Sequence, residues 1–349
     1  MQNKDTKHKG RIFFPPIAHE VLSKFLLIIH LSASPAFLSC SEKDMTGNDM
    51  QEESVIELSS KAFTTGGTLD LFVFDTDALA RLDSRMRVIC NGSLPERIPV
   101  SSRSGHKRVV ALANWSENEP AWEKVNSFSA LCRMMVPLTT DNPLAPRMSG
   151  SMVINTGGTA STKLSLTTLS AKIRLASIRC DFTGKPYQGS ILKDARVYLT
   201  NVCTNSSPFP ENYPGSEFIN VGGYSMADLE AFGAKDLLSR KIFADIGPEI
   251  VKTGIDFYCY SNYCSEEGCG MPPTRLVLEG QLNGKTVYYP VNLGDYTGGA
   301  VRGGYTYVID LKITQYGTDD PDTPVSGGTL ESSIRVIPWE QKDPETIDY

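Results

Sequence analysis

The sequence predicts an all-β protein of two tandem antiparallel β-sandwich domains with short helical insertions. From residue 69 onward, short apolar runs alternate with clusters of Gly, Pro, Asn and Ser, as strands and turns do in β-sandwiches. The chain has 349 residues, more than a single hydrophobic core usually serves, so two domains are expected. Its hydrophobic fraction of 40% indicates a globular chain and excludes a disordered one.

Strands in the first half are predicted from two kinds of pattern. Residues 69–74 are apolar on both faces except at Asp70, as in a central strand. Residues 170–175 alternate apolar and basic side chains, which is typical of a half-buried strand. Further strands are expected at 55–58, 109–113 and 195–201.

The second half is rich in aromatic and β-branched residues, which favour pleated sheets. Successive antiparallel strands are expected at 255–260, 275–280, 286–291 and 305–313. A last candidate strand, 330–339, places Leu330, Ile334 and Val336 on one face and ends near Pro338, which breaks pairing. Helical spacing is confined to residues 120–135 and 226–238.

The first forty residues have the organisation of an export signal. Basic residues at positions 4, 7, 9 and 11 precede an apolar run over 21–31, which is too short to span a bilayer. We therefore expect residues 1–39 to be a signal peptide. The net charge of −6 and the lack of a dense basic run give no reason to expect nucleic acid as a partner.

The sequence Phe37-Leu38-Ser39-Cys40 is similar to a bacterial lipobox, although Phe37 is an atypical first residue. We expect Cys40 to carry a lipid that anchors the protein to a membrane, since acyl chains supply membrane affinity where no helix can. The alternative is a plain signal peptide followed by a free cysteine. The polar residues 41–53 fit a tether after the anchor.

Seven cysteines remain beyond Cys40. Cys259, Cys264 and Cys269 are spaced for a loop disulfide in an oxidising compartment, or less plausibly for a metal site, which usually has tighter pairs and a fourth ligand. Three others lie in apolar contexts and are expected to be small core residues: Cys90, Cys132 and Cys180.

Catalytic chemistry has little support. His106 is the single histidine beyond the leader, and neither nucleophile-elbow, zinc-helix nor phosphate-loop motifs occur. The acidic run 318–322 could bind Ca²⁺, but it lacks the Gly and Glu of a helix-loop-helix calcium site, so a polar turn is favoured. We expect no catalytic residue, no metal, no cofactor and no enzyme activity.

The order of these segments and their amino-acid sequences resemble those of the fimbrillin superfamily of Bacteroidales, the subunits of type V pili. The resemblance covers most of the chain after the leader. It rests on these segments: Leu69 to Asp75, Val109 to Asn114, Met148-Ser149-Gly150, Ala171-Lys172-Ile173, Phe257-Tyr258 to Asn262, Pro273-Thr274 to Leu276, Tyr288 to Val291, and Ile313 to Pro321 with Gly317.

The resemblance implies two transthyretin-like sandwiches, exported as a lipoprotein. A linker hinted at by Gly184-Lys185-Pro186 divides them into residues 62–184 and 185–349, after a tether and removable first strand over 40–61. In similar subunits a trypsin-like protease cuts after a basic residue just before Ala-Phe. Lys61 and Ala62 stand at that place, with Lys where the family usually has Arg.

By this resemblance the chain is expected to be a stalk or tip subunit of a fimbrium on the cell surface. It would be anchored in the outer membrane until cleavage, then join other fimbrial subunits by strand exchange, with residues 330–339 as donor strand. One alternative is an uncleaved anchor lipoprotein of the same system. Another is a surface glycan-binding β-sandwich, prompted by aromatic residues in turns: Tyr187, Tyr213, Tyr224, Tyr260 and Tyr263.

Overall fold

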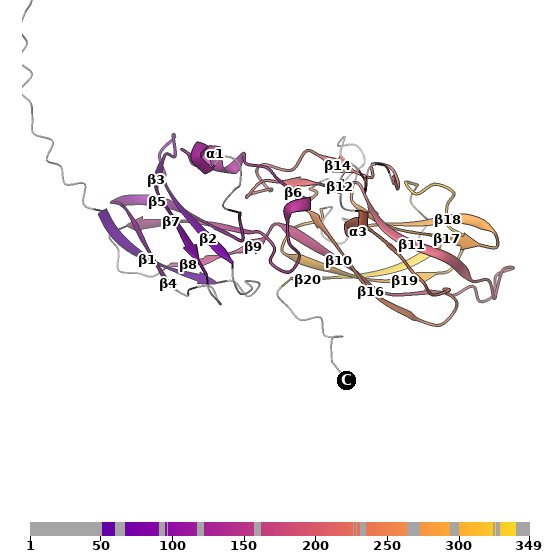
Figure 1. Ribbon diagram of the computed structural model, residues 1–349. Coiled ribbons are helices and arrows are strands. Elements are labelled where there is room, and N and C mark those ends of the chain that lie inside the picture. Colours follow the sequence, from indigo (N-terminus) through magenta and orange to yellow (C-terminus); the bar gives the residue numbers. More distant parts are fainter. Residues whose placement is uncertain are drawn as a thin grey trace, which may run out of the picture. The chain divides into compact units, whose positions relative to one another are not determined.

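Two β-sheets face each other across an apolar core in the first half of the protein (Figure 1). The computed structural model describes residues 51–59, 67–90, 95, 97–116, 122–156, 162–225, 227, 229–230, 235–263, 273–293, 300–323, 325 and 329–339. The smaller sheet has the order β4-β1-β8, formed by Arg97–Arg103, Gln51–Ser59 and Thr162–Ser165. The larger sheet has the order β3-β2-β5-β7-β9, formed by Leu82–Ile89, Thr68–Asp75, Gly105–Ala113, Met148–Thr156 and Thr167–Thr168.

Strand β2 is buried on both faces, which explains its almost unbroken apolar sequence. Leu69, Leu71 and Val73 face the core shared with the smaller sheet. Phe72 and Phe74 face the other way and pack under the 3₁₀ turn η1 (Trp122–Lys124) and helix α1 (Phe128–Cys132). The larger sheet is thus covered on both sides.

A second sandwich follows, with its core between two four-stranded sheets. One has the order β16-β10-β19-β20, formed by Val251–Tyr260, Ser170–Cys180, Tyr305–Ile313 and Leu330–Pro338. The other has the order β15-β11-β17-β18, formed by Ser239–Lys241, Leu192–Thr200, Arg275–Leu282 and Lys285–Asn292. The remaining elements are short: β6 (Val136–Pro137), η2 (Leu138–Thr140), β12 (Val202–Cys203), β13 (Asn205–Ser206), β14 (Phe218–Ile219) and α3 (Lys235–Leu238).

The predicted all-β sandwich architecture is confirmed, as is each strand predicted from an apolar pattern. Two strand pairs, β1 with β8 and β10 with β19, run parallel, so the two sheets that contain them are mixed, whereas the other two large sheets are antiparallel as predicted. Of the four strands expected in succession, only β17 and β18 pair with each other, because the chain crosses between the two sheets from β16 to β17 and from β18 to β19.

Short helices lie within both segments that have helical spacing. The described residues of 120–135 contain η1 and α1, the latter capped by the Ser127 hydroxyl, which accepts a bond from the Ala130 N–H. In the range 226–238 the described part ends in α3. Within the described chain, every helix falls short of the length and apolar character needed to cross a bilayer.

The division near residue 184 stays a prediction. Strand β10, which precedes it in sequence, pairs with β16 and β19, so the chain changes sandwich between β9 and β10. Short strands also join the two halves, since β6 pairs with β13.

A buried carboxylate stabilises the larger sheet. Asp70 is fully buried in β2 and accepts two bonds from Arg87, at 2.9 and 2.7 Å, and one from Arg85 at 3.1 Å. The Arg85 guanidinium in turn lies over the Phe72 and Trp122 rings, 5.1 and 4.7 Å from their centroids. One carboxylate therefore orders the strand β3 and the aromatic layer beneath η1.

We predict that Asp70→Asn lowers the free energy of unfolding by about 2 to 4 kcal/mol, because it leaves two arginines without their buried counter-charge. Urea denaturation of the purified protein measures the change. Asp194→Asn is the matched control: its carboxylate is exposed and lies 3.7 Å from Lys241, so a loss under about 1 kcal/mol is expected. Equal losses in both variants would contradict the assigned role of Asp70.

Candidate functional site

The candidate site is the strand β1 and the slot that it fills in the smaller sheet (Figure 1). Strand β1 pairs antiparallel with β4 from Gln51↔Arg103 to Glu57↔Arg97, and parallel with β8 from Ile56↔Thr162 to Ser59↔Ser165. It is the middle strand, and β4 and β8 share no ladder with each other. The sheet therefore exists only while a strand occupies the slot.

Strand β1 presents alternate side chains to the core. Ile56 is fully buried opposite Ile98, and Ser54 is 7% exposed opposite Val100, whereas Val55 between them is 43% exposed. The side chain of Leu58, two residues further along the strand, lies outside the described residues. Ile56 belongs to the core cluster that also holds Leu71 and Leu164.

The outer face of β1 adds little binding energy. Glu57 forms an ion pair of 2.9 Å with Arg97 of β4, but the two side chains are 37% and 69% exposed. Solvent screens such pairs strongly. The backbone ladder and the burial of Ile56 are therefore the main contacts that hold β1.

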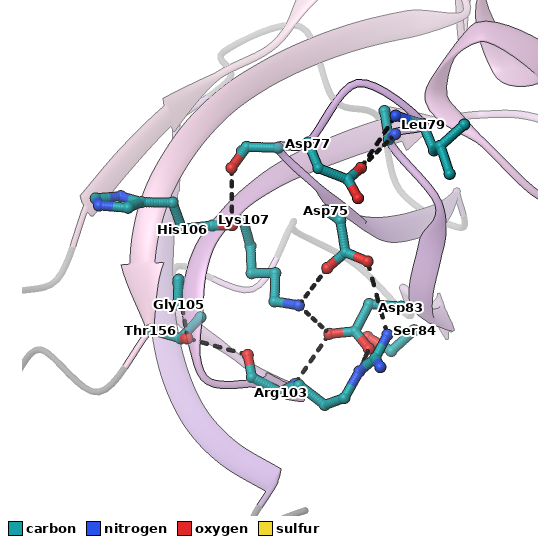
Figure 2. A network of polar contacts seen from close by, with 12 residues as sticks. Asp75, Asp77, Leu79, Asp83, Ser84, Arg103, Gly105, His106, Lys107 and Thr156 are labelled. Carbon is teal, nitrogen blue, oxygen red and sulfur yellow. Dashed lines mark hydrogen bonds and ion pairs between the residues drawn. The ribbon is translucent and has the colours of Figure 1, made fainter.

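The first wall of the slot, β4, is fixed by a polar network that does not involve β1 (Figure 2). Lys107 of β5 is 4% exposed and donates to Asp75 of β2 at 2.5 Å and to Asp83 of β3 at 2.9 Å. Arg103, the last residue of β4, donates to Asp83 through its side chain at 2.7 Å and its N–H at 2.9 Å. In addition, the Ser84 hydroxyl donates to the carbonyl of Ser101 at 2.7 Å. These contacts tie β4 to the larger sheet.

The charges in this network stabilise each other. Burial by itself raises the pKa of Asp83, but hydrogen bonds from Lys107 and Arg103 outweigh it and hold the pKa below its ordinary 3.8. Burial likewise lowers the pKa of Lys107, while its bonds to Asp75 and Asp83 raise it, with a net rise above 10.5. Asp83 and Lys107 are therefore both ionised at neutral pH.

The second wall, β8, is held against strand β7 by a close backbone approach. A Cβ atom at Gly150 of β7 would lie 2.1 Å from the carbonyl oxygen of Ser165, so only glycine allows this contact. Leu164 and Leu166, on either side of Ser165, are buried in the same core as Ile56. Both walls thus have contacts that remain when β1 is absent.

The sequence-predicted processing and lipidation residues, Lys61, Ala62 and Cys40, lie outside the described residues. The strands on either side of Lys61 and Ala62 belong to different sheets: β1 ends at Ser59 in the smaller sheet, and β2 begins at Thr68 in the larger one. The chain therefore passes between the two sheets within residues 60–67. A cut there would leave β1 joined to the sandwich by noncovalent contacts alone.

The predicted donor segment forms strand β20 at the edge of its own sheet. It pairs with β19 from Tyr305↔Pro338 to Ile313↔Leu330 and has no strand on its other side within the described chain. Leu330 is buried, and Ile334 and Val336 pack partly against the core. This confirms the predicted face of alternate apolar residues.

The cysteines that the structure describes are core residues. Cys90, Cys132 and Cys180 are buried free thiols, as predicted. Cys259, one of the three cysteines among which a loop disulfide was expected, is a buried free thiol of β16 that faces the core, and burial raises its pKa to about 12. Cys264 and Cys269 lie outside the described residues. Among the residues that the structure describes, no group of three His, Cys, Asp or Glu side chains could hold a metal.

The acidic run 318–322 forms a turn in which the carboxylates of Asp320 and Asp322 are already bonded. Asp320 accepts from the N–H of Asp322 at 2.9 Å and from the Thr323 hydroxyl at 3.0 Å. Asp322 pairs with the buried Arg275. The polar turn, rather than a calcium site, is the arrangement that the structure has.

The aromatic residues that prompted a glycan-binding alternative are mostly packed. Tyr260 is fully buried, while Tyr187, Tyr213 and Tyr224 pack against the core. Only Tyr263 of the five reaches 36% exposure. They form no exposed aromatic platform, so the observation behind this alternative is removed.

Sequence reasoning missed both walls of the slot and the network behind them. Strand β4 carries a period-two pattern, with Ile98, Val100 and Ser102 buried and their neighbours exposed, which could have identified it. The network left no signal, because its members come from four separate strands.

No family model and no curated protein matches the sequence. Solved structures do match the fold. A candidate cell adhesion protein of Bacteroides eggerthii has a TM-score of 0.60 at 18% identity, over 83% of this chain and 96% of its own. A candidate cell adhesion protein of Parabacteroides distasonis has a TM-score of 0.59 at 16% identity, over 83% of this chain and 100% of its own. The fimbrilin FimA of Porphyromonas gingivalis has a TM-score of 0.56 at 18% identity, over 82% of this chain and 96% of its own. The chain has the fold of these proteins.

We predict that Ile56→Ala lowers the free energy of unfolding by about 2 to 5 kcal/mol, because it removes the fully buried side chain of β1. Val55→Ala, a matched truncation on the exposed face of the same strand, is expected to cost under about 1 kcal/mol. Urea denaturation of the uncleaved chain separates the two. Similar losses would show that β1 is not seated with Ile56 inward.

We predict that the network weakens in acid. Because the folded pKa of Asp83 lies below the unfolded value, its stabilisation is full above that value and disappears as pH falls through the folded pKa. Below about pH 5, Asp83→Asn should therefore lose stability less steeply than the unmodified chain. Denaturation at pH 7 and pH 3 tests this, with the exposed Asp245→Asn as control. Parallel pH profiles for all three proteins would contradict the prediction.

Proposed function

We propose, from the fold shared with fimbrilin and the central place of β1, that the chain is a structural subunit of a type V fimbrium. It is exported as a lipoprotein, loses its first strand to a protease, and polymerises by strand exchange on the cell surface. The observation that carries this proposal is that β1 lies between two strands that share no ladder, and that the chain joins it to the rest within residues 60–67.

Removal of β1 would leave an apolar slot. Seven residue pairs with β4 and four with β8 would lose their ladder partner. The core residues Ile98, Val100 and Leu164 would lose the side chain of Ile56 that covers them. Unpaired strand edges beside an apolar groove recruit another extended chain, so the vacated slot is a site for strand addition.

The walls would survive the loss of β1. The bonds among Lys107, Asp83 and Arg103 hold β4, and the close approach at Gly150 holds β8. A slot with fixed walls needs less ordering when a new strand enters, which favours binding.

Strand β20 of a second subunit is the proposed occupant. As an edge strand, β20 has one ladder to leave, the one with β19, before both of its edges can pair with β4 and β8. Its row of alternate apolar side chains fits the slot, and each large side chain buried there would contribute roughly 1.5 to 3 kcal/mol. Such a joint should dissociate slowly. The partners are therefore other fimbrial subunits and, for processing, a trypsin-like protease acting at Lys61-Ala62.

Before processing, a lipid on Cys40 would hold the chain at the outer membrane through the polar tether 41–53. If the bond after Lys61 stays intact in the cell, the same fold serves instead as an uncleaved anchor. No enzyme activity is proposed.

We predict that the intact chain is monomeric and that trypsin treatment, which produces a new N-terminus at Ala62, converts it to polymer. Lys61→Gln should block both events, whereas Lys163→Gln, a matched change on β8, should block neither. A chain that ends at residue 329 should be cleaved but remain unpolymerised. N-terminal sequencing and size-exclusion chromatography report the two steps. Cleavage without polymer in the full-length chain would exclude the subunit function.

A further inference from the structure

Strand β1 carries a buried hydroxyl that has no hydrogen-bond partner. Ser54 lies on the core-facing side of β1, opposite Val100, and within the described chain nothing accepts from or donates to its Oγ. The same is true of the Oγ of Ser102 on β4. Ser102 is 1% exposed and pairs with Glu52, one core-facing position before Ser54.

Among the described residues, the nearest neighbours of Ser54 on the core-facing side are aliphatic and offer its hydroxyl no hydrogen bond. Its neighbours on the same face, Ile56 of β1 and Ile98 and Val100 of β4, are buried aliphatic residues of one apolar cluster. A hydroxyl removed from water without a partner destabilises the structure that buries it. This cost belongs to β1 itself, and it disappears when another strand with an apolar side chain takes the same position.

We infer that Ser54 makes β1 a weaker occupant of its slot than the strand that replaces it, and that this difference drives exchange. The inference rests on the proposed function. An uncompensated hydroxyl in the resident strand gives the exchange a direction, because the incoming strand gains burial at a position where the outgoing strand loses it. The Ser102 hydroxyl stays in the wall and is available to either occupant.

The replacing strand is β20 of a second copy, in one particular register. Running in the direction of β1, with Ile334 in the place of Ser54, β20 puts Val336 in the place of Ile56. The same register puts Ser332 in the place of Glu52, opposite Ser102, where two hydroxyls can bond to each other. Both buried hydroxyl defects of the slot are then relieved. A register shifted by two residues places Ser332 in the position of Ser54 and keeps the defect.

The experiment compares Ser54→Val with Ser54→Thr, which have the same shape and differ by a methyl against a hydroxyl. The full chain is cleaved after Lys61, and mass spectrometry follows loss of the fragment that contains β1. We expect Ser54→Val to slow this loss roughly tenfold relative to Ser54→Thr. Val55→Ser, which adds a hydroxyl on the exposed face, should leave the rate nearly unchanged. Equal rates for Ser54→Val and Ser54→Thr would overturn the inference.

The register is tested with a labelled synthetic peptide of residues 329–339 added to the cleaved chain. Ser332→Val in this peptide should leave its affinity unchanged or lower it, because the change removes the partner of Ser102. Tighter binding would show that Ser332 sits in the Ser54 position and would overturn the register.

If the proposed function itself is wrong, these experiments give a result that differs from failure of the inference about Ser54. In that case the cleaved chain binds no peptide and forms no polymer, while the dissociation rates of β1 in the Ser54 variants can still be measured.

Discussion

The smaller sheet of the N-terminal sandwich depends on the hydrogen-bond ladder between β1 and its two neighbours. Strands β4 and β8 do not pair with each other, so their inner edges are satisfied only by the strand between them. Backbone pairing is indifferent to sequence, and the core below requires only alternate apolar side chains. A strand of suitable pattern other than β1 could therefore fill the slot, which is the physical basis for the proposed exchange.

The larger sheet provides the stable framework for this exchangeable position. Its strand β2 is buried on both faces, and Asp70 links it to β3 through two arginines. The ionic network around Lys107 joins β4 to the same framework, since its members come from β2, β3, β4 and β5. Strong contacts are thus concentrated in the part that stays, while β1 contributes one fully buried large side chain among its described residues, Ile56.

The two candidate partner strands of this chain differ in how well they are seated. Strand β1 is a central strand with a buried, unpartnered hydroxyl at Ser54. Strand β20 is an edge strand that keeps one side free and carries Leu330, Ile334 and Val336 on one face. Polymerisation by strand exchange requires two features on one polypeptide: a first strand, here β1, that fits its slot imperfectly, and an apolar edge strand, here β20.

The sequence by itself determined the all-β class and the strands with strong apolar or alternating patterns, such as β2, β10 and β19, because hydrophobic periodicity is a local property. It also identified residues 55–58 as a short first strand. Only the tertiary structure decided that β1 is central, that β4 and β8 are its walls, and that Lys107, Asp83 and Arg103 meet. Strand order and ion pairs join residues far apart in the chain, and local pattern carries no record of which distant edges will pair.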